Sequence, residues 1–260
     1  MNQATLIFVP ETHSTNNLLA EIAHEKLSQN SYLEDFTLLY ADYQNGGRGL
    51  ADNVWHSNPK ENILMSLHFR LTLPPQKQFF FNMFFALSVR ALLAPYIDNV
   101  KIKWPNDVYV GDKKIAGILI EHTIQGESLL QTIAGVGINI NQETFPTAVP
   151  NPTSLKLETG QEYDVPALLQ EYITNARPYY NLLLNNEYDL LSEEYYKYMY
   201  RLNEYHTYII RQQEVRAAIC GVNEHGQLLL KDEVGEGYCC GYKEVGGEWR
   251  VESGELRVES

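Results

Sequence analysis

Apolar residues recur along the chain at two different spacings, which predict helices in some segments and strands in others. In residues 14–28 they fall on one face of a helix that Ser14 or Thr15 can cap. Residues 76–96 are apolar almost all round, which predicts a buried helix. Two further helices, with tyrosines along their flanks, are predicted at residues 166–184 and 188–202.

Short runs of branched and aromatic residues between these helices predict strands. They lie at residues 36–43, 62–69, 100–104, 107–110, 114–121 and 129–139. The turn at residues 111–113 predicts a hairpin between two of them. Because helices seldom alternate with these strands, the predicted fold class is α+β, with helices packed on a mixed, largely antiparallel sheet.

The pattern changes after about Tyr205, where short strand-like runs alternate with turns rich in Gly and Asn up to residue 251. This spacing is typical of a small β-barrel of about fifty residues. The sequence therefore predicts two domains, residues 1–204 and residues 205–260.

Composition excludes several classes of protein. Hydrophobic residues make up 44% and charged residues 20%, as in a soluble globular protein. Asp and Glu outnumber Lys and Arg by 33 to 20, which argues against a protein that coats nucleic acid but not against a local basic pocket.

Three unevenly spaced cysteines predict reduced thiols rather than a disulfide framework. No secretory signal or membrane-spanning segment is found, so we expect a cytoplasmic protein with no membrane partner.

Two polar loops contain candidate binding residues. In Gln44-Asn45-Gly46-Gly47-Arg48-Gly49, backbone N–H groups can approach an anion and the guanidinium can bind it. Alone, this loop is better explained as an ordinary hairpin turn, since it lacks the ending of a P-loop. Trp55 follows in a polar segment, where it either stacks on a flat heterocycle or folds back over the core.

The segment Lys103-Trp104-Pro105-Asn106-Asp107 is the strongest candidate. Lys103 ends a predicted strand, and Pro105 interrupts the ladder so that the chain turns. A lysine at such a strand end can neutralise a carboxylate together with a phosphate, while Asn106 and Asp107 would cap the turn or hold a metal–triphosphate. A purely structural role is disfavoured, because Lys and Trp have no packing reason to occupy a turn.

Glycines interrupt two predicted strands, at Gly117 in one and at Gly135 and Gly137 in the other. A glycine inside a strand costs stability and usually marks the close approach of a ligand or another backbone. Two such strands facing one cavity would form a slot for a thin, flat, mostly uncharged ligand. The seven histidines show no spacing typical of zinc ligands.

Together these segments resemble the biotin protein ligase family. The motifs occur in the family's order: Ser14-Thr15-Asn16, Gln44 through Gly49, Trp55-His56-Ser57, Lys103 through Asp107, Lys114 through Glu121 and Gly135 through Asn141. The resemblance implies the class II synthetase-like biotin/lipoate ligase fold and a small C-terminal SH3-like β-barrel.

The resemblance also implies a two-step reaction. Biotin's carboxylate attacks the α-phosphate of ATP, giving biotinyl-5′-AMP and pyrophosphate. A lysine of a biotin carboxyl carrier protein domain, in a carboxylase or decarboxylase, then attacks the anhydride and releases AMP. Arg48 and Lys103 would be catalytic, because they would offset the repulsion between the two anions. Mg²⁺ is expected with ATP, although its ligands are not identified.

The expected ligand-binding residues follow from the same resemblance. Those for biotin are Ser14, Thr15, Asn16, Gln44, Gly47, Arg48, Gly49, Leu50, Lys103, Gly117, Leu119, Gly135 and Gly137. Those for ATP are Arg48, Trp55, Lys103, Asn106 and Asn139.

Two features depart from the family's pattern. The motifs begin at Ser14, so we expect the short form without the N-terminal DNA-binding domain, and no DNA partner. Leu50-Ala51-Asp52-Asn53 stands where the family commonly has basic or polar residues and a glycine. This exchange predicts weaker retention of biotinyl-AMP, unless Leu50 instead covers biotin with apolar surface.

Three alternatives stay open on the sequence. A lipoate–protein ligase of the same superfamily would need a longer, wholly apolar tunnel. A non-catalytic biotin or nucleotide sensor would need less charge than Arg48 and Lys103 together provide. A homodimer paired through an exposed sheet edge and a monomer are both compatible with the sequence.

Overall fold

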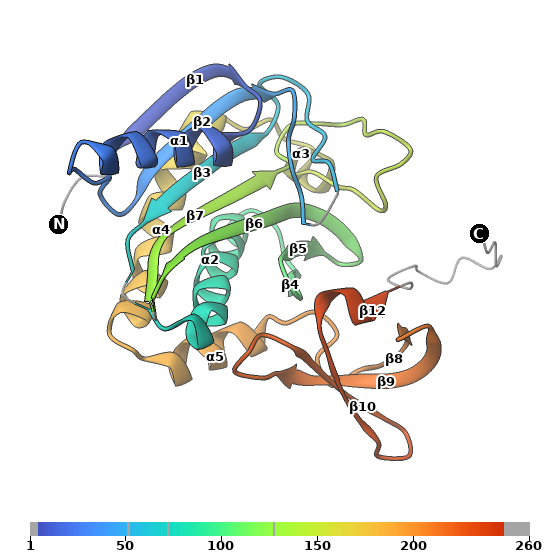
Figure 1. Ribbon diagram of the computed structural model, residues 1–260. Helices are drawn as coiled ribbons and strands as arrows, with labels where there is room; N and C mark the ends of the chain where they lie inside the picture. Colours follow the sequence, from blue (N-terminus) through green and yellow to red (C-terminus); the bar gives the residue numbers. More distant parts are fainter. Residues whose placement is uncertain (1–4, 51–52, 72, 127, 247–260) are drawn as a thin grey trace. The chain divides into compact units, whose positions relative to one another are not determined.

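The protein is described by a computed structural model that covers residues 5–50, 53–71, 73–126 and 128–246 (Figure 1). The chain divides into two compact units, Met1–Tyr200 and Arg201–Ser260. Within the described ranges, no helix is long and apolar enough to cross a membrane.

The larger unit is built on a seven-stranded sheet in the order β1-β2-β3-β7-β6-β5-β4. β1 and β2 are parallel, and every other neighbouring pair is antiparallel. The prediction of a mixed, largely antiparallel sheet is therefore confirmed. The strands are β1 (Leu6–Thr12), β2 (Thr37–Gln44), β3 (Ile63–Phe69), β4 (Val100–Lys103), β5 (Asp107–Val110), β6 (Lys113–Gln125) and β7 (Ser128–Ile138).

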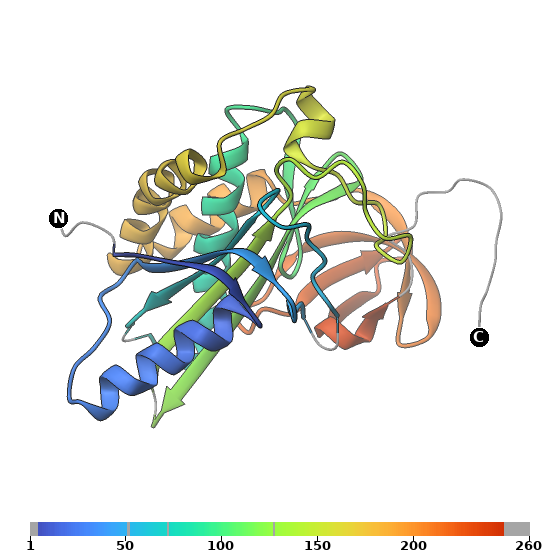
Figure 2. The same cartoon turned by 90° about the horizontal axis from the view of Figure 1, so that it is seen from above.

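Helices cover both faces of this sheet, as Figure 2 shows. α1 (Thr15–Ser28) packs on β2, β3 and β7, where Leu19 joins Leu39 and Ile133 in a buried cluster. α2 (Gln78–Leu93) packs on β4, β5 and β6 from the other face and also contacts α4 (Val165–Leu184) and α5 (Tyr188–Lys197). The predicted buried helix is confirmed, because most of α2 is buried. Two short helices, η1 (Pro75–Lys77) and α3 (Leu155–Thr159), complete the unit.

The last predicted helix of this unit is shorter than the sequence indicates. α5 ends at Lys197, whereas the prediction extended to residue 202. The chain after it pairs with β4 instead, since the N–H of Ile102 donates to Tyr198 O at 2.8 Å and the N–H of Tyr200 donates to Ile102 O at 2.8 Å. Backbone pairing with the sheet edge therefore ends the helix.

The smaller unit is a five-stranded antiparallel sheet in the order β11-β10-β9-β8-β12. Its strands are β8 (Tyr205–Ile210), β9 (Gln213–Val222), β10 (Leu228–Asp232), β11 (Gly237–Cys240) and β12 (Val245–Gly246), with the short helix η2 (Tyr242–Glu244) before β12. Tyr208, Ile219, Leu230 and Cys240 are buried. The predicted strand-like runs after residue 246 lie outside the described residues.

A partly buried histidine in β6 makes the stability of the larger unit depend on pH. The His122 ring packs against Phe81 of α2, and its Nδ1 lies 2.8 Å from Thr132 Oγ1. Desolvation by burial lowers the pKa of His122 to about 4. Below about pH 6.5 the unfolded chain therefore binds a proton that the folded chain does not, so the folded state loses stability as pH falls.

We expect the His122→Gln variant to lose less stability than the wild type between pH 7 and pH 5. The difference should be at most about 1.4 kcal/mol per pH unit below the pKa of the unfolded chain. Urea denaturation at several pH values measures it, with the exposed His24→Gln as the control. Equal pH slopes for wild type and His122→Gln would contradict this assignment.

Candidate active site

One row of cross-strand partners runs through the middle of the larger sheet. Lys103 lies opposite Asp107, Asp107 opposite Gly117, Gly117 opposite Gly137, and Gly137 opposite Leu64. Directly opposed residues of antiparallel strands point to the same face of the sheet. Lys103 and Asp107 therefore share a face with the bare backbone of the two glycines, as the predicted slot requires.

The ring of Trp55 occupies this slot. A Cβ atom added at Gly117 would lie 2.9 Å from Trp55 Cζ3, and one added at Gly137 would overlap with the indole. The indole Nε1 is buried and has no hydrogen-bond partner. The sequence allowed Trp55 either to stack on a flat heterocycle or to fold back over the core. In this structure its ring folds back over the sheet. The two glycines are needed because a flat ring lies directly on their backbone.

A second, polar cluster lies next to the slot, at the start of α1. Asn16 lies against Gly135, where a Cβ atom would overlap with Asn16 Oδ1. Ser66 Oγ donates to Asn16 Oδ1 at 2.6 Å and lies 2.8 Å from Thr15 Oγ1. Gln44 Oε1 accepts from the backbone N–H of Thr15 at 2.6 Å and from its hydroxyl at 2.9 Å. The predicted residues Thr15, Asn16, Gln44 and Gly135 are thus brought together, and Ser66 joins them without having been predicted.

Ser14 and the loop after β2 complete this side of the site. Ser14 is buried at the N-cap position of α1, although its side chain makes no capping hydrogen bond. The loop folds on itself, because the N–H of Trp55 donates to Gly47 O at 2.9 Å and the N–H of Gly49 donates to Asn53 O at 2.7 Å. Leu50 lies in this turn, whereas residues 51–52 of the altered segment are outside the described ranges.

Arg48 points to a carboxylate in this structure. Its Nη2 lies 2.7 Å from Glu121 Oε2, and both side chains are about two-fifths exposed, at 40% and 42%. Glu121 follows Gly117 by four residues on β6, which corresponds to about 13 Å along a strand. The guanidinium therefore contacts a different part of the sheet face from the row that contains Lys103. The expectation that Arg48 and Lys103 flank one phosphate stays a prediction.

Two lysines lie beside the glycines of this row. Lys103 is only 6% exposed, and its Nζ donates to the hydroxyl of Tyr109 at 2.9 Å. Lys114 Nζ lies 2.7 Å from Asp107 Oδ1 and would lie 3.3 Å from a Cβ atom at Gly117. Lys114 was not among the predicted site residues, yet it provides a second cation beside the slot.

The predicted asparagines differ in the hydrogen bonds they make. Asn106 Nδ2 donates to Ile118 O at 2.6 Å, so its side chain fastens the turn after β4 to β6. Asn139 Nδ2 donates to Thr153 O at 2.9 Å, but its Oδ1 is buried without a partner. Leu119 contributes its backbone oxygen, which accepts from Asn16 Nδ2 at 3.1 Å. A ligand that donates a hydrogen bond would satisfy Asn139.

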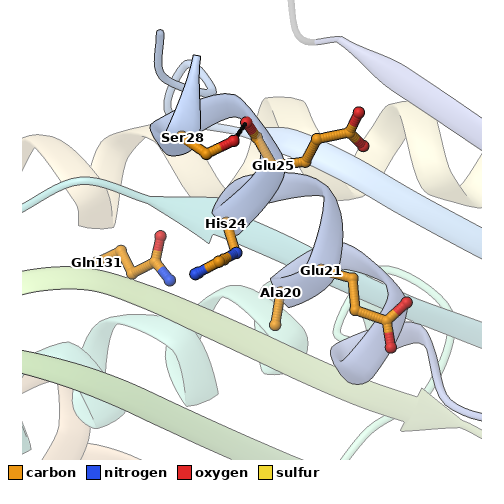
Figure 3. A pocket seen from close by; sticks show the side chains of 6 residues that line it. All are labelled: Ala20, Glu21, His24, Glu25, Ser28 and Gln131. Carbon is orange, nitrogen blue, oxygen red and sulfur yellow. Dashed lines mark hydrogen bonds between the residues drawn. The ribbon is translucent and has the colours of Figure 1, made fainter. Parts of the chain in front are cut away.

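A separate hollow of about 600 Å³ lies between α1 and β7 (Figure 3). It is lined by Ala20, Glu21, His24, Glu25, Ser28 and Gln131, with His24 pointing toward Gln131. Gln131 precedes Gly137 by six residues on β7, so this hollow is away from the glycine row. None of the predicted site residues lines it.

The same segments that build this face are matched in known proteins. The sequence profile of the Biotin/lipoate A/B protein ligase family matches residues 8–139. The chain belongs to this family. The matched range contains most of β1, all of β2 to β7, and the helices α1 and α2, and thus the glycine row and the polar cluster.

The chain is also similar in sequence to individual members of the family. The chain is 35% identical to the bifunctional ligase/repressor BirA of Bacillus spizizenii over 155 residues, which is 58% of this chain and 47% of that one. It is 26% identical to the BirA of Escherichia coli over 235 residues, which is 90% of this chain and 71% of that one. The chain thus spans about half the length of the Bacillus relative.

A solved ligase structure shares the fold. The biotin protein ligase of Aquifex aeolicus, in complex with biotin and ATP, superposes with a TM-score of 0.73 at 24% identity. The similarity covers 93% of this chain and 97% of that one.

Proposed function

We propose that this protein is an ATP-dependent biotin protein ligase that forms biotinyl-5′-AMP and transfers biotin to a lysine of a carrier domain. The observation that carries the proposal is the face of the sheet on which the bare backbone of Gly117 and Gly137, covered by the Trp55 ring in this structure, lies between a polar cluster and two lysines. Biotin has a flat polar ureido ring and a carboxylate at the end of an apolar chain, which this arrangement fits. The names of the ligase relatives support the same conclusion.

In this proposal each group has a defined role. Thr15, Asn16 and Gln44 hydrogen-bond the ureido ring, since they already form one polar network at the end of the slot. Lys103, together with Lys114, offsets the repulsion between the carboxylate of biotin and the α-phosphate of ATP. Asn139 Oδ1 accepts a hydrogen bond from the adenine amino group, because it is buried without another partner.

The expected Mg²⁺ would bind to this site mainly through the phosphates of ATP rather than through protein side chains. Within the part of the chain that the structure describes, no group of three or more His, Cys, Asp or Glu residues could hold a metal. Asp107, the carboxylate in the glycine row, is paired with Lys114. Mg²⁺ commonly keeps several waters and binds substrate phosphates with only one or two carboxylates.

The acceptor we propose is a biotin carboxyl carrier protein domain of a biotin-dependent carboxylase or decarboxylase. The excess of acidic over basic residues supports a protein partner rather than DNA, and a cytoplasmic location would place enzyme and acceptor together.

We further propose that the smaller unit is an SH3-like barrel, which its antiparallel five-stranded sheet supports. A homodimer paired through β1 is also proposed, since Leu6 and Phe8 are exposed at that sheet edge; sedimentation tests it against a monomer.

Biotin-dependent release of pyrophosphate from ATP tests the proposed function. A biotin ligase releases pyrophosphate when biotin is added and then labels a carrier domain. A lipoate–protein ligase responds to lipoate instead. A sensor binds its ligand but releases no pyrophosphate, so either of these results would overturn the proposal.

The Leu50→Arg variant is expected to label bystander proteins less than the wild type does. A cation at this position would hold the phosphate of biotinyl-AMP, so less of the activated intermediate would leave the site. Labelling of serum albumin during incubation with biotin and ATP measures this loss, with Leu50→Gln as an uncharged control. Unchanged labelling in Leu50→Arg would favour the alternative, in which Leu50 covers biotin with apolar surface.

A further inference from the structure

Tyr109 of β5 lies on the same face of the sheet as Lys103. Lys103 is the cross-strand partner of Asp107, and Tyr109 follows Asp107 by two residues on β5. Directly opposed residues, and residues two apart on one strand, point to the same face. The phenol hydroxyl lies 2.9 Å from Lys103 Nζ and accepts a hydrogen bond from it. Since Tyr109 is 7% exposed and Lys103 is 6% exposed, this contact is made away from water.

The acceptor that Tyr109 provides is neutral, which matters for a lysine that has to act on anions. A carboxylate in its place would offset the charge of the ammonium, whereas a phenol orients the ammonium and leaves its charge in place. The ring adds a second attraction, because Lys103 Nζ lies 4.5 Å from its centroid. Tyr109 therefore fixes the position of the charge without cancelling it.

A β-bulge in β6 directs a second lysine to the neighbouring carboxylate. The register between β5 and β6 shifts just before Tyr109, which pairs with Lys114. Without the extra residue, Lys114 and Gly117 would point to opposite faces, because they are three residues apart. With it, Lys114 Nζ lies 2.7 Å from Asp107 Oδ1. Lys114 thus pairs with the carboxylate that is the cross-strand partner of Lys103.

The ring of Tyr109 is itself held by the segment that follows α5. Tyr200 pairs with the edge strand β4, since its N–H donates to Ile102 O at 2.8 Å. Its ring contacts that of Tyr109, with centroids 5.3 Å apart and planes tilted by 42°. The hydroxyl of Tyr200 also donates to Asp112 in the turn between β5 and β6. The hydroxyl of Tyr109 that meets Lys103 therefore has a fixed place.

We propose that Tyr109 is a positioning residue that holds the ammonium of Lys103 where the carboxylate of biotin meets the α-phosphate of ATP. This inference rests on the proposed function. Tyr109 touches neither reactant in this role and acts only through Lys103. A displacement of about 1 Å at a reacting centre can cost on the order of 10²-fold in rate. Loss of the hydroxyl should therefore slow the chemical step more than it weakens binding.

Steady-state kinetics of Tyr109→Phe tests the proposal, because this variant removes the hydroxyl and keeps the ring. We expect the kcat for biotin-dependent pyrophosphate release to fall about tenfold or more, as for the loss of a hydrogen bond to a charged group. The KM for biotin should stay within about threefold of the wild type, since an interaction that counts mainly in the transition state lowers kcat. An unchanged kcat would overturn the proposal, and so would a rise in KM that exceeds the fall in kcat.

A double variant separates positioning from direct catalysis. Once Lys103 is replaced, the hydroxyl of Tyr109 has no ammonium to hold. The variant Lys103→Ala/Tyr109→Phe should therefore be no slower than Lys103→Ala. A further fall in kcat in the double variant would mean that Tyr109 acts on the reactants directly, which contradicts a positioning role.

The matched control is Tyr180→Phe, which removes another phenol hydroxyl from the interior of the larger unit. Tyr180 donates to Asp35 and packs among Phe36, Phe69 and Phe84, none of which belongs to the candidate site. This variant should keep both kinetic constants of the wild type, even where thermal melting shows a loss of stability. If its kcat falls as far as that of Tyr109→Phe, the effect is one of general stability and the proposal is wrong.

Proton exchange of the Lys103 ammonium gives a readout that does not depend on activity. A buried, hydrogen-bonded group exchanges its protons with water slowly. Nuclear magnetic resonance of ligand-free protein with isotope-labelled lysine measures this rate, and the Lys103 signal is identified by its absence in Lys103→Ala. The ammonium should exchange faster in Tyr109→Phe than in Tyr180→Phe, and equal rates would overturn the role of Tyr109. If the wild type releases no pyrophosphate with biotin, the proposed function fails, while the exchange experiment still decides whether Tyr109 holds Lys103.

Discussion

Replacing Lys103 with alanine is expected to lower biotin-dependent pyrophosphate release by on the order of 10²-fold or more. The side chain is almost wholly buried beside the glycine row, where its charge is poorly screened by water. Its removal leaves the repulsion between the carboxylate of biotin and the α-phosphate without the nearest buried cation. Pyrophosphate release at saturating biotin and ATP measures the effect directly.

A second lysine provides the control for this experiment. Lys113 is exposed at the start of β6 and is paired with Glu158, away from the slot. The Lys113→Ala variant should keep the rate of the wild type, and thermal melting should show that both variants are folded. A loss of less than tenfold in Lys103→Ala would show that another group supplies the charge, for which Lys114 is the candidate.

The Gly137→Ala variant is expected to weaken binding of biotin and of ATP. The added methyl group would overlap with the ring that now lies on the strand, and any flat ligand ring in the slot would meet the same obstacle. Overpacking of this kind costs about 1–3 kcal/mol, which corresponds to a rise of about 5- to 150-fold in the dissociation constant. Isothermal titration calorimetry measures the two constants.

Gly237→Ala is the matched control, because a Cβ atom there would meet nothing within 4 Å. This variant should bind both ligands as the wild type does. Normal biotin and ATP binding by Gly137→Ala would show that the slot is not the ligand site. A lowered melting temperature in Gly137→Ala alone would not support the prediction, which concerns affinity.

The sequence was sufficient to predict the central strands and the hairpin between β5 and β6. These segments have strong apolar patterns and clear turns, so local preferences and tertiary packing agree. β1 (Leu6–Thr12) was not predicted, because Pro10 and the acidic Glu11 interrupt its short apolar run. Its parallel pairing with β2 also depends on a contact across α1, which no local pattern reveals.

The candidate site was only partly predictable. The glycines could be identified because they are unfavourable inside strands, and the structure shows what lies on them. The partners of Trp55 and Arg48 could not be predicted, since they depend on how one loop folds across the sheet. Glu121 could have been found by alternation along β6, where it shares a face with Gly117 and Leu119.

β3 and β7 are neighbours in the sheet although α2 and three strands separate them in sequence, and Ser66 lies opposite Gly135. The slot and its polar cluster are thus complete only when β3 has paired with β7, the last strand of this sheet to be synthesised. Pairing of strands that are distant in sequence loses loop-closure entropy before any contact stabilises it, so we expect this pair to form late in folding. A bound ligand stabilises only chains that have finished this step. Under the proposed function, biotin should therefore raise the fraction of chains in which β3 and β7 have paired.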